Sequence, residues 1–399
     1  MRFFLVSDRL FMSTFYMRTK NMKIGFDITA LSMPRTGIGQ YQYNLLQTLF
    51  KMDSKNSYHL YAFNLRDNGK YEDLKFKTPH NNVSMKAHNI PQRLITAWWL
   101  AVRYPYLEKI TQECDLYQIS EICQQPTKKK TVAFIHDLTT LHFPEYHLAK
   151  NKILYHFRFK NIKKYADAVL TNSQHTKNDI IKYLGIPEEK IHVTYFGAHE
   201  RFRPITDKIQ IGEVLRRYDI NYPYICYVGT IEPRKNLVNL LRAFKLLKDT
   251  KKIPHKLLLI GKDGWFFEEI YKTVGELGLE NEVIRTGFAP DEDIPYLLNG
   301  CDTFVYPSFY EGFGLPVLEA LACGVPTITS NNSSLPEVGG NAVKYINPED
   351  PEDIANKIFQ FLHNEDERDR YSALGLKQAE KFSWESCAKE TLKVYESLL

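Results

Sequence analysis

Residues 301–322 read CDTFVYPSFYEGFGLPVLEALA and set a pattern that the rest of the chain repeats. The apolar run that ends near Ser308 predicts a buried strand. Gly312 and Gly314 predict a tight turn, and Pro316 suits the first turn of the helix that follows. A buried strand followed at once by a helix is typical of a parallel sheet that is covered on both faces.

The same alternation of strand and helix forms two series along the chain. The first begins at Lys23 and ends near residue 197, and the second begins at Tyr224. Residues 199–222 break the periodicity and predict a linker, while residues 91–110 predict one long apolar helix. Two series of about 180 residues predict an α/β protein with two Rossmann-like, doubly wound parallel-sheet domains. Ligands bind such sheets at the carboxyl ends of the strands, so we expect a cleft between the domains.

The composition excludes several classes of protein. A chain of 399 residues, 44% hydrophobic and 25% charged, predicts two or three folded domains and excludes a disordered chain or a collagen-like repeat. No stretch reaches the roughly 18 apolar residues of a spanning helix, which excludes an integral membrane bundle. The six cysteines form no C-x-x-C pair, so we expect reduced thiols and a cytoplasmic location.

Residues 1–21 are basic and partly apolar, but Asp8 and Arg9 interrupt them, which makes a poor signal peptide. Two interpretations of this N-terminal extension stay open. Either it is a non-native upstream start and Met22 is the real one, or it is a short helix that adheres to a surface.

The charge is divided unevenly along the chain. Residues 1–200 carry 28 Lys and Arg against 17 Asp and Glu, and residues 201–399 carry 24 against 30. The first half therefore has a charge of +11 and the second −6, which gives the net +5. A basic half indicates an anionic membrane surface, an anionic substrate or a nucleic acid as a partner of that half.

The glycine turn has the residues of an anion site. Gly312 and Gly314 allow the backbone to approach a ligand, and the free N–H groups of the following helix attract a phosphate or diphosphate. Glu311 and Glu319 flank this turn, eight residues apart. Eight helical residues span about 12 Å, too wide to assume the pair of carboxylates of a glycosidase. The spacing favours one carboxylate at each end of a bound polar molecule, with Glu319 at ribose hydroxyls and Glu311 at the far end.

A second strand-to-helix segment, Gly229–Asn236, reads GTIEPRKN. Its Arg234 and Lys235 are expected at the carboxyl end of a strand, where a fork-shaped and a point-like cation together suit a diphosphate. His136 ends an N-terminal strand and is a third candidate.

Two further segments give weaker indications of a binding site. Residues 36–39, Thr-Gly-Ile-Gly, allow close approach to an anion but do not complete the dinucleotide fingerprint, because residue 42 is Gln. Asp291–Asp293 has the D-x-D pattern of a metal site, yet its place before a helix favours capping and dipole charges. No nucleic-acid recognition motif is evident, so nucleic acid is not an expected partner.

Taken together, GTxEPRKN and the later EGFGLxxxE element resemble the retaining glycosyltransferases of family 4, which have the GT-B fold. The resemblance spans Met22 to about Lys381. It implies an acceptor-binding domain over 22–204, a donor-binding domain over 205–382, and a last helix over 383–399 that returns to the N-terminal domain.

The resemblance also implies roles for individual residues. Arg234 and Lys235 would neutralise the donor diphosphate, Glu319 would hold the ribose and Glu311 the hydroxyls of the transferred sugar. His136 would contact the sugar near its 6-hydroxyl. The remaining donor contacts would come from glycines and their neighbours: Gly37, Gly39, Gly229, Thr230, Gly287, Phe288, Gly312, Phe313, Gly314 and Leu315, with the base near Gly287 and Phe288.

The expected activity is transfer of a hexose from a nucleotide sugar to a glycan or lipid-linked acceptor in surface polysaccharide or glycoconjugate biosynthesis. The EPRKN variant resembles the mannosyltransferase-like branch, which makes GDP-mannose the expected donor; UDP-glucose and UDP-N-acetylglucosamine stay open. We expect no cofactor and no metal, with the leaving phosphate as base in a front-face attack. The alternatives are a nucleotide-sugar epimerase of the same fold and a non-catalytic sugar- or nucleotide-binding protein. The basic first half predicts a peripheral position on the inner membrane face.

Overall fold

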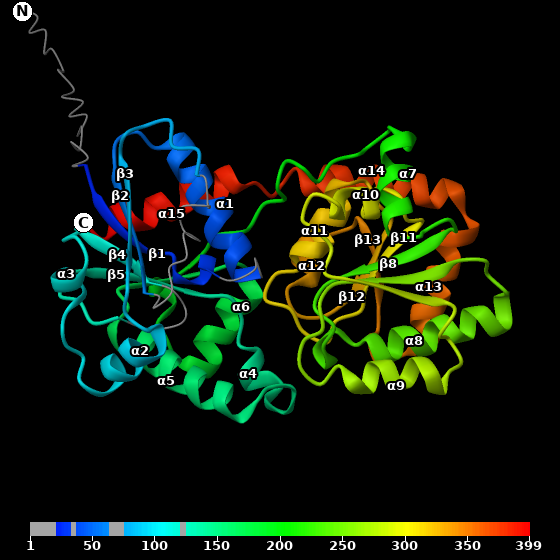
Figure 1. Ribbon diagram of the computed structural model, residues 1–399, viewed down its shortest axis with the longest axis horizontal. Coiled ribbons are helices and arrows are strands. Elements are labelled where there is room, and N and C mark those ends of the chain that lie inside the picture. Colours follow the sequence, from blue (N-terminus) through cyan, green and yellow to red (C-terminus); the bar gives the residue numbers. More distant parts are fainter. Residues whose placement is uncertain (1–20, 33–36, 64–75, 120–124) are drawn as a thin grey trace, which may run out of the picture.

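The computed structural model describes residues 21–32, 37–63, 76–119 and 125–399. Two α/β domains lie side by side, and the chain passes between them twice (Figure 1). The predicted extension lies outside the described residues except for residue 21.

The N-terminal domain has one parallel sheet with the order β3-β2-β1-β4-β5-β6-β7. Its strands are β1 (Lys23–Asp27), β2 (Ser57–Phe63), β3 (Val83–His88), β4 (Leu116–Ile119), β5 (Lys130–Ile135), β6 (Ala168–Thr171) and β7 (Ile191–Val193). The covering helices are α1 (Gly37–Met52), α2 (Gln92–Ala101), α3 (Leu107–Ile110), α4 (Thr139–His142), α5 (Ala149–Tyr165) and α6 (Gln174–Asp179), the last continued by a π-helical turn, Ile180–Leu184.

The C-terminal domain has a second parallel sheet with the order β10-β9-β8-β11-β12-β13. Its strands are β8 (Tyr224–Val228), β9 (Lys256–Ile260), β10 (Val283–Gly287), β11 (Thr303–Tyr306), β12 (Thr327–Ser330) and β13 (Val343–Ile346). Its helices are α7 (Lys208–Arg217), α8 (Leu237–Leu246), α9 (Glu268–Glu276), α10 (Ile294–Asn299), α11 (Leu315–Ala322), α12 (Leu335–Gly339), α13 (Pro351–His363) and α14 (Glu365–Ala379). All residues of β11 are buried, as expected of a strand that is covered on both faces. The prediction of two doubly wound parallel sheets is therefore confirmed.

The last helix, α15 (Trp384–Ser397), packs against α1 of the N-terminal domain. Its first residue, Trp384, stacks on Phe196 with ring centroids 5.4 Å apart. Near its end, the hydroxyl of Tyr395 donates to the side chain of Gln118 on β4. The chain therefore returns to the domain in which it began (Figure 1).

Two predicted elements are wrong in detail. The helix expected over residues 91–110 is split into α2 and α3, because Pro105 has no N–H for a helix interior and disfavours helical backbone at Tyr104. The linker expected over residues 199–222 contains α7, whose N-cap Asp207 accepts hydrogen bonds from the backbone of Ile209 and Gln210. Among the described helices, none is both long and apolar enough to cross a membrane.

Candidate functional site

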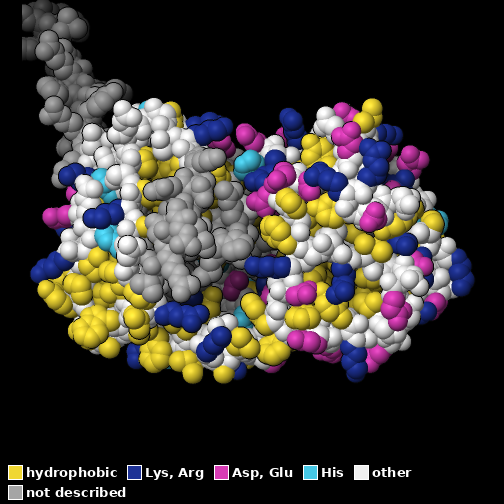
Figure 2. All heavy atoms as spheres, viewed as in Figure 1, with side chains coloured by type: hydrophobic (Ala, Val, Ile, Leu, Met, Phe, Trp, Pro, Cys, Tyr) yellow, Lys and Arg dark blue, Asp and Glu magenta, His cyan; other side chains and the backbone are white. Residues whose placement is uncertain are grey.

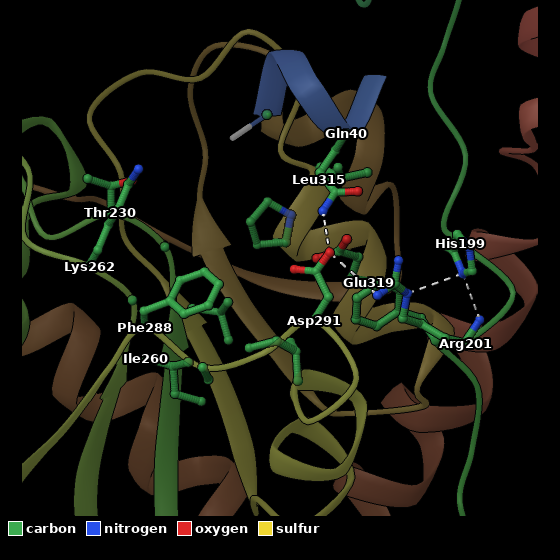
Figure 3. A pocket seen from close by; sticks show the side chains of 18 of the residues that line it. Gln40, His199, Arg201, Thr230, Ile260, Lys262, Phe288, Asp291, Leu315 and Glu319 are labelled. Atoms are coloured by element: carbon green, nitrogen blue, oxygen red, sulfur yellow. Dashed lines mark hydrogen bonds and ion pairs between the residues drawn. The ribbon is translucent and has the colours of Figure 1, made fainter. Parts of the chain in front are cut away.

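A cavity of about 250 Å³ lies where the two domains face each other (Figure 3). It is walled by the start of α1, by the chain that leaves β7, and by the carboxyl ends of β8, β9 and β10 with the start of α11. Six of the predicted donor-binding residues line it: Gly37, Gly229, Thr230, Phe288, Leu315 and Glu319. The Phe288 ring is 63% exposed at this wall and offers a flat apolar surface. Gly287 lines a neighbouring pocket together with Asp263 and Arg285.

Glu319 brings a carboxyl group into the cavity wall from within α11. Burial raises its pKa to about 8, and the carboxylate of Asp291 adds to this effect, while Arg201 opposes it. The side chain is therefore mostly protonated at neutral pH. A group of this kind can accept or donate hydrogen bonds to hydroxyls of a ligand.

A network of four cavity residues crosses the domain boundary. Asp291 belongs to the acidic segment noted in the sequence, whereas no sequence motif marks Gln40, His199 or Arg201. Gln40 on α1 donates to Asp291 Oδ2 at 2.8 Å, and Arg201 Nη1 lies 3.6 Å from the same oxygen. The Arg201 Nε–H in turn donates to His199 Nδ1 at 3.2 Å. Figure 3 shows these side chains joined one after another, next to Glu319. They come from three distant segments, so only the packing of the domains brings them together.

Arg234, Lys235 and Glu311 form a compact charged cluster. The turn after β8 continues as a short 3-10 helix, Pro233–Lys235, and the turn after β11 carries Glu311. Lys235 Nζ lies 2.5 Å from Glu311 Oε1, and Arg234 Nη1 lies 3.0 Å from Glu311 Oε2. Each carboxylate oxygen therefore faces one cation.

Further partners hold both cations in place. Arg234 donates to Glu232 Oε1 at 2.7 Å and to the Tyr310 carbonyl at 2.7 Å, and Lys235 donates to the Tyr306 hydroxyl at 2.7 Å. Burial alone would raise the pKa of Glu311, but Arg234 and Lys235 outweigh it and lower that pKa to about 2. The cluster therefore holds two cations and two carboxylates in a nearly dry setting, where electrostatic interactions are strong.

His136 meets the glycine turn from the opposite domain. Its carbonyl oxygen is so near that a Cβ on Gly312 would lie 2.1 Å from it, which only glycine avoids. Burial lowers the pKa of the His136 imidazole to about 3, so the ring is neutral at physiological pH. The Gly312 carbonyl also accepts a hydrogen bond from Ser173 Oγ at 2.7 Å. His136 and Gly312, which are both predicted to contact the donor, are thus brought together.

The remaining predicted residues have mainly backbone roles in the structure. Gly314 adopts φ +106°, a value that favours glycine, directly before α11 begins at Leu315. The Phe313 ring packs on Phe196 with centroids 5.2 Å apart, so its side chain belongs to the contact between the domains. Gly39 is buried inside α1.

A carboxylate of the C-terminal domain caps a helix of the N-terminal domain. Glu337 on α12 accepts hydrogen bonds from the backbone N–H groups of Gln174 and His175 at 2.8 and 2.7 Å. The Tyr195 hydroxyl donates to the same side chain at 3.0 Å. These contacts hold the start of α6 against the C-terminal domain.

The acidic segment Asp291–Asp293 does not cap α10 through its side chains, contrary to the prediction. Asp293 instead accepts from Arg217 Nη2 and from the Tyr218 hydroxyl, both at 2.8 Å, and Asp291 lines the cavity. Across the described ranges, no group of three or more His, Cys, Asp or Glu side chains is arranged to hold a metal ion.

Two family models match the chain, one for each domain. Residues 37–200 match "Glycosyltransferase Family 4", and residues 216–378 match "Glycosyl transferases group 1". Together the two matches cover most of both sheets and the turns that carry the charged cluster.

Curated relatives agree with these models. The chain is 32% identical over 395 residues to the O-antigen chain mannosyltransferase B of Escherichia coli, which covers 94% of this chain and 100% of that protein. It is also 33% identical over 275 residues to the serotype-specific mannosyltransferase WbdA of Escherichia coli, where the match covers 68% of this chain but only 34% of WbdA.

Solved structures share the architecture at low sequence identity. Anabaena HepE in complex with UDP-glucose superposes with a TM-score of 0.72 at 19% identity, covering 95% of this chain and 100% of that one. WaaG, a glycosyltransferase involved in lipopolysaccharide biosynthesis, superposes with a TM-score of 0.69 at 13% identity, covering 93% and 99%. At these identities the likeness concerns the fold.

Proposed function

The chain belongs to the family-4 glycosyltransferases of the GT-B fold, and from this premise we propose that it transfers mannose from GDP-mannose to a glycan or lipid-linked acceptor. The proposed process is the biosynthesis of a surface polysaccharide, which the name of the 32% identical relative supports. UDP-glucose and UDP-N-acetylglucosamine are the alternative donors.

The observation that carries the proposal is the cluster of Arg234, Lys235 and Glu311. A diphosphate can replace the Glu311 carboxylate between the two cations, because it presents negative oxygens to the same donors. The cations then stabilise the charge that develops on the leaving nucleoside diphosphate. Glu319 and Phe288 line the same cavity. In the proposal the Glu319 carboxyl group holds the ribose, and the exposed Phe288 ring supports the base.

We propose that transfer retains the anomeric configuration and needs no metal ion. In this proposal Glu311 hydrogen-bonds hydroxyls of the transferred sugar and does not act as a nucleophile. The departing phosphate would therefore take the proton of the acceptor hydroxyl on the same face of the sugar. Two cations would supply the electrostatic stabilisation that a metal ion supplies elsewhere.

The experiment is a donor panel on the purified protein. GDP-mannose should raise the melting temperature more than UDP-glucose or UDP-N-acetylglucosamine, because a ligand at 100 times its Kd stabilises by about 2.7 kcal/mol. Transfer to an acceptor should persist in EDTA, and the product should keep the anomeric configuration of the donor. Conversion of the donor without any acceptor would indicate an epimerase, and a stronger response to a UDP-sugar would overturn the choice of donor.

A lipid-linked acceptor would place the enzyme at the inner face of the membrane as a peripheral protein. This location is part of the proposal and is supported by the surplus of basic residues in the first half of the chain.

A further inference from the structure

Large apolar side chains are exposed on two helices of the N-terminal domain. On α2 and the turn after it these are Leu94, Trp98, Val102 and Tyr104, and on α5 they are Ile153 and Phe157. We call this set the α2–α5 face. Leu94 is 66% exposed, Ile153 61% and Trp98 54%. Figure 2 shows hydrophobic side chains gathered over this part of the molecule, where Figure 1 places α2 and α5.

Helix α2 is apolar on both of its sides. Ile95 and Trp99 pack into the core of the N-terminal domain, where Trp99 is only 1% exposed. Leu94 and Trp98, four residues apart, form a second stripe that faces outward. A helix that is apolar all round is normally buried on all sides, so the outer stripe of α2 indicates a partner.

The same two helices carry only positive charge. Residues 91–104 and 149–165 contain eight Lys and Arg residues and no Asp or Glu. Lys160 and Lys164 continue the Ile153–Phe157 face of α5 by one and two further turns. The Arg103 guanidinium lies 3.7 Å from the centre of the Tyr165 ring, which joins the end of α2 to the end of α5.

We propose that the α2–α5 face docks on the surface of an anionic phospholipid bilayer, an inference that rests on the proposed use of a lipid-linked acceptor. Apolar and aromatic side chains enter the interface, and the surrounding lysines pair with lipid phosphates. A second copy of the chain is a poorer occupant, because a symmetric contact would bring the two sets of cations together. Lysine is also depleted in protein interfaces, whereas tryptophan and tyrosine are enriched at membrane interfaces.

The test is sedimentation of the full chain with vesicles of phosphatidylcholine, with and without phosphatidylglycerol. The protein should bind only vesicles that contain phosphatidylglycerol, and binding should weaken in high salt. Changing Lys160, Lys163 and Lys164 together to Gln should lower the partition coefficient about a hundredfold, at roughly fivefold for each lysine. Trp98→Gln with Phe157→Gln should lower it at least tenfold.

Matched controls lie on the C-terminal domain. Ile209→Gln changes an exposed apolar residue of α7, and Lys251, Lys272 and Lys377 changed together to Gln remove three exposed lysines. Neither control should alter binding to vesicles.

Three results would overturn the inference. The first is binding to phosphatidylcholine vesicles that is as strong as binding to vesicles with phosphatidylglycerol. The second is a loss of binding in the control variants that is as large as in the variants of the α2–α5 face. The third is self-association without vesicles that Trp98→Gln abolishes. Stabilisation by GDP-mannose is measured on the same variants and should not change. If the wild type binds vesicles but shows no response to any nucleotide sugar, the proposed function fails while the docking surface stands.

Discussion

Replacing Glu319 by Gln should stabilise the protein, and the gain should grow as the pH rises. Burial in the cavity wall raises the pKa of this carboxyl from 4.5 to about 8. Between these two pH values the unfolded chain releases a proton that the folded chain retains. The stability of the wild type therefore falls as the pH rises through this interval, and it is constant above it.

The magnitude follows from the width of the interval. At about 1.36 kcal/mol per pH unit, the shift corresponds to at most about 5 kcal/mol. Because the cavity is open to water on one side, we expect a gain of about 2–3 kcal/mol for Glu319→Gln at pH 8. For a domain of this size that is a rise in Tm of about 4–12 °C.

The assay is thermal unfolding of both proteins from pH 5 to pH 9. The difference in Tm should be small at pH 5, widen up to pH 8 and then stay constant. Glu385→Gln, a change of an exposed carboxyl in the first turn of α15, should show no such trend. A difference that is the same at every pH would refute the argument from burial.

The same proton should couple to the binding of the donor. A carboxylate that accepts both ribose hydroxyls is ionised, so binding below pH 8 would release a proton, and the Kd would improve by up to tenfold per pH unit. Calorimetry in two buffers of different ionisation enthalpy measures that release. If proton release were equal in Glu319→Gln, the ribose contact would belong to another residue.

The remaining predictions concern the cluster and the domain contacts. Lys235→Ala should cost about 2–4 kcal/mol of transition-state stabilisation, while the exposed Lys272→Ala should leave turnover unchanged; a normal kcat would remove the proposed role. Gly312→Ala places a Cβ 2.1 Å from the backbone of the facing domain and should lower turnover about a hundredfold, whereas Gly212→Ala meets nothing within 4 Å and should slightly stabilise α7. Glu337→Ala removes the acceptor of two backbone N–H groups and should lower the free energy of unfolding by about 1–3 kcal/mol, measurable by urea titration.

The architecture was largely predictable, because a parallel strand covered on both faces has a continuous apolar run that is visible in one sequence. The strand that escaped prediction, β3, lies at the edge of its sheet and exposes Ser84, Met85 and Lys86, so its pattern is not that of a buried strand. The helix over residues 91–110 was overextended because the apolar pattern continues past Pro105, where the backbone does not.

The site was predictable only where one short segment carries its own signal. Arg234, Lys235 and Glu311 stand in turns whose glycines and charges are evident along the chain, and Glu319 stands in the helix that follows the second turn. The ion pairs between these segments join Glu311 to Lys235, 76 positions away, and to its neighbour Arg234, and no local pattern in the sequence indicates such contacts. Gln40 and Asp291 are 251 positions apart. The sequence around each residue predicts only the local helix or turn and not the contact between them.

Glu311 pairs with two cations in the structure and is expected to bind the transferred sugar. It can do both only if its partners change when the donor binds. In the structure its oxygens occupy the donors of Arg234 and Lys235, and the resemblance assigns it to the hydroxyls of the sugar. Glu232 balances one of the two buried cations, and Glu311 balances the other, so the cluster is neutral in the free protein. A diphosphate brings more negative charge than one carboxylate, so it can take over both cations and release Glu311 toward the neighbouring sugar. The carboxylate thereby becomes available for the sugar only when the diphosphate is bound, and Glu232 and Tyr306 keep the cations in place during the exchange.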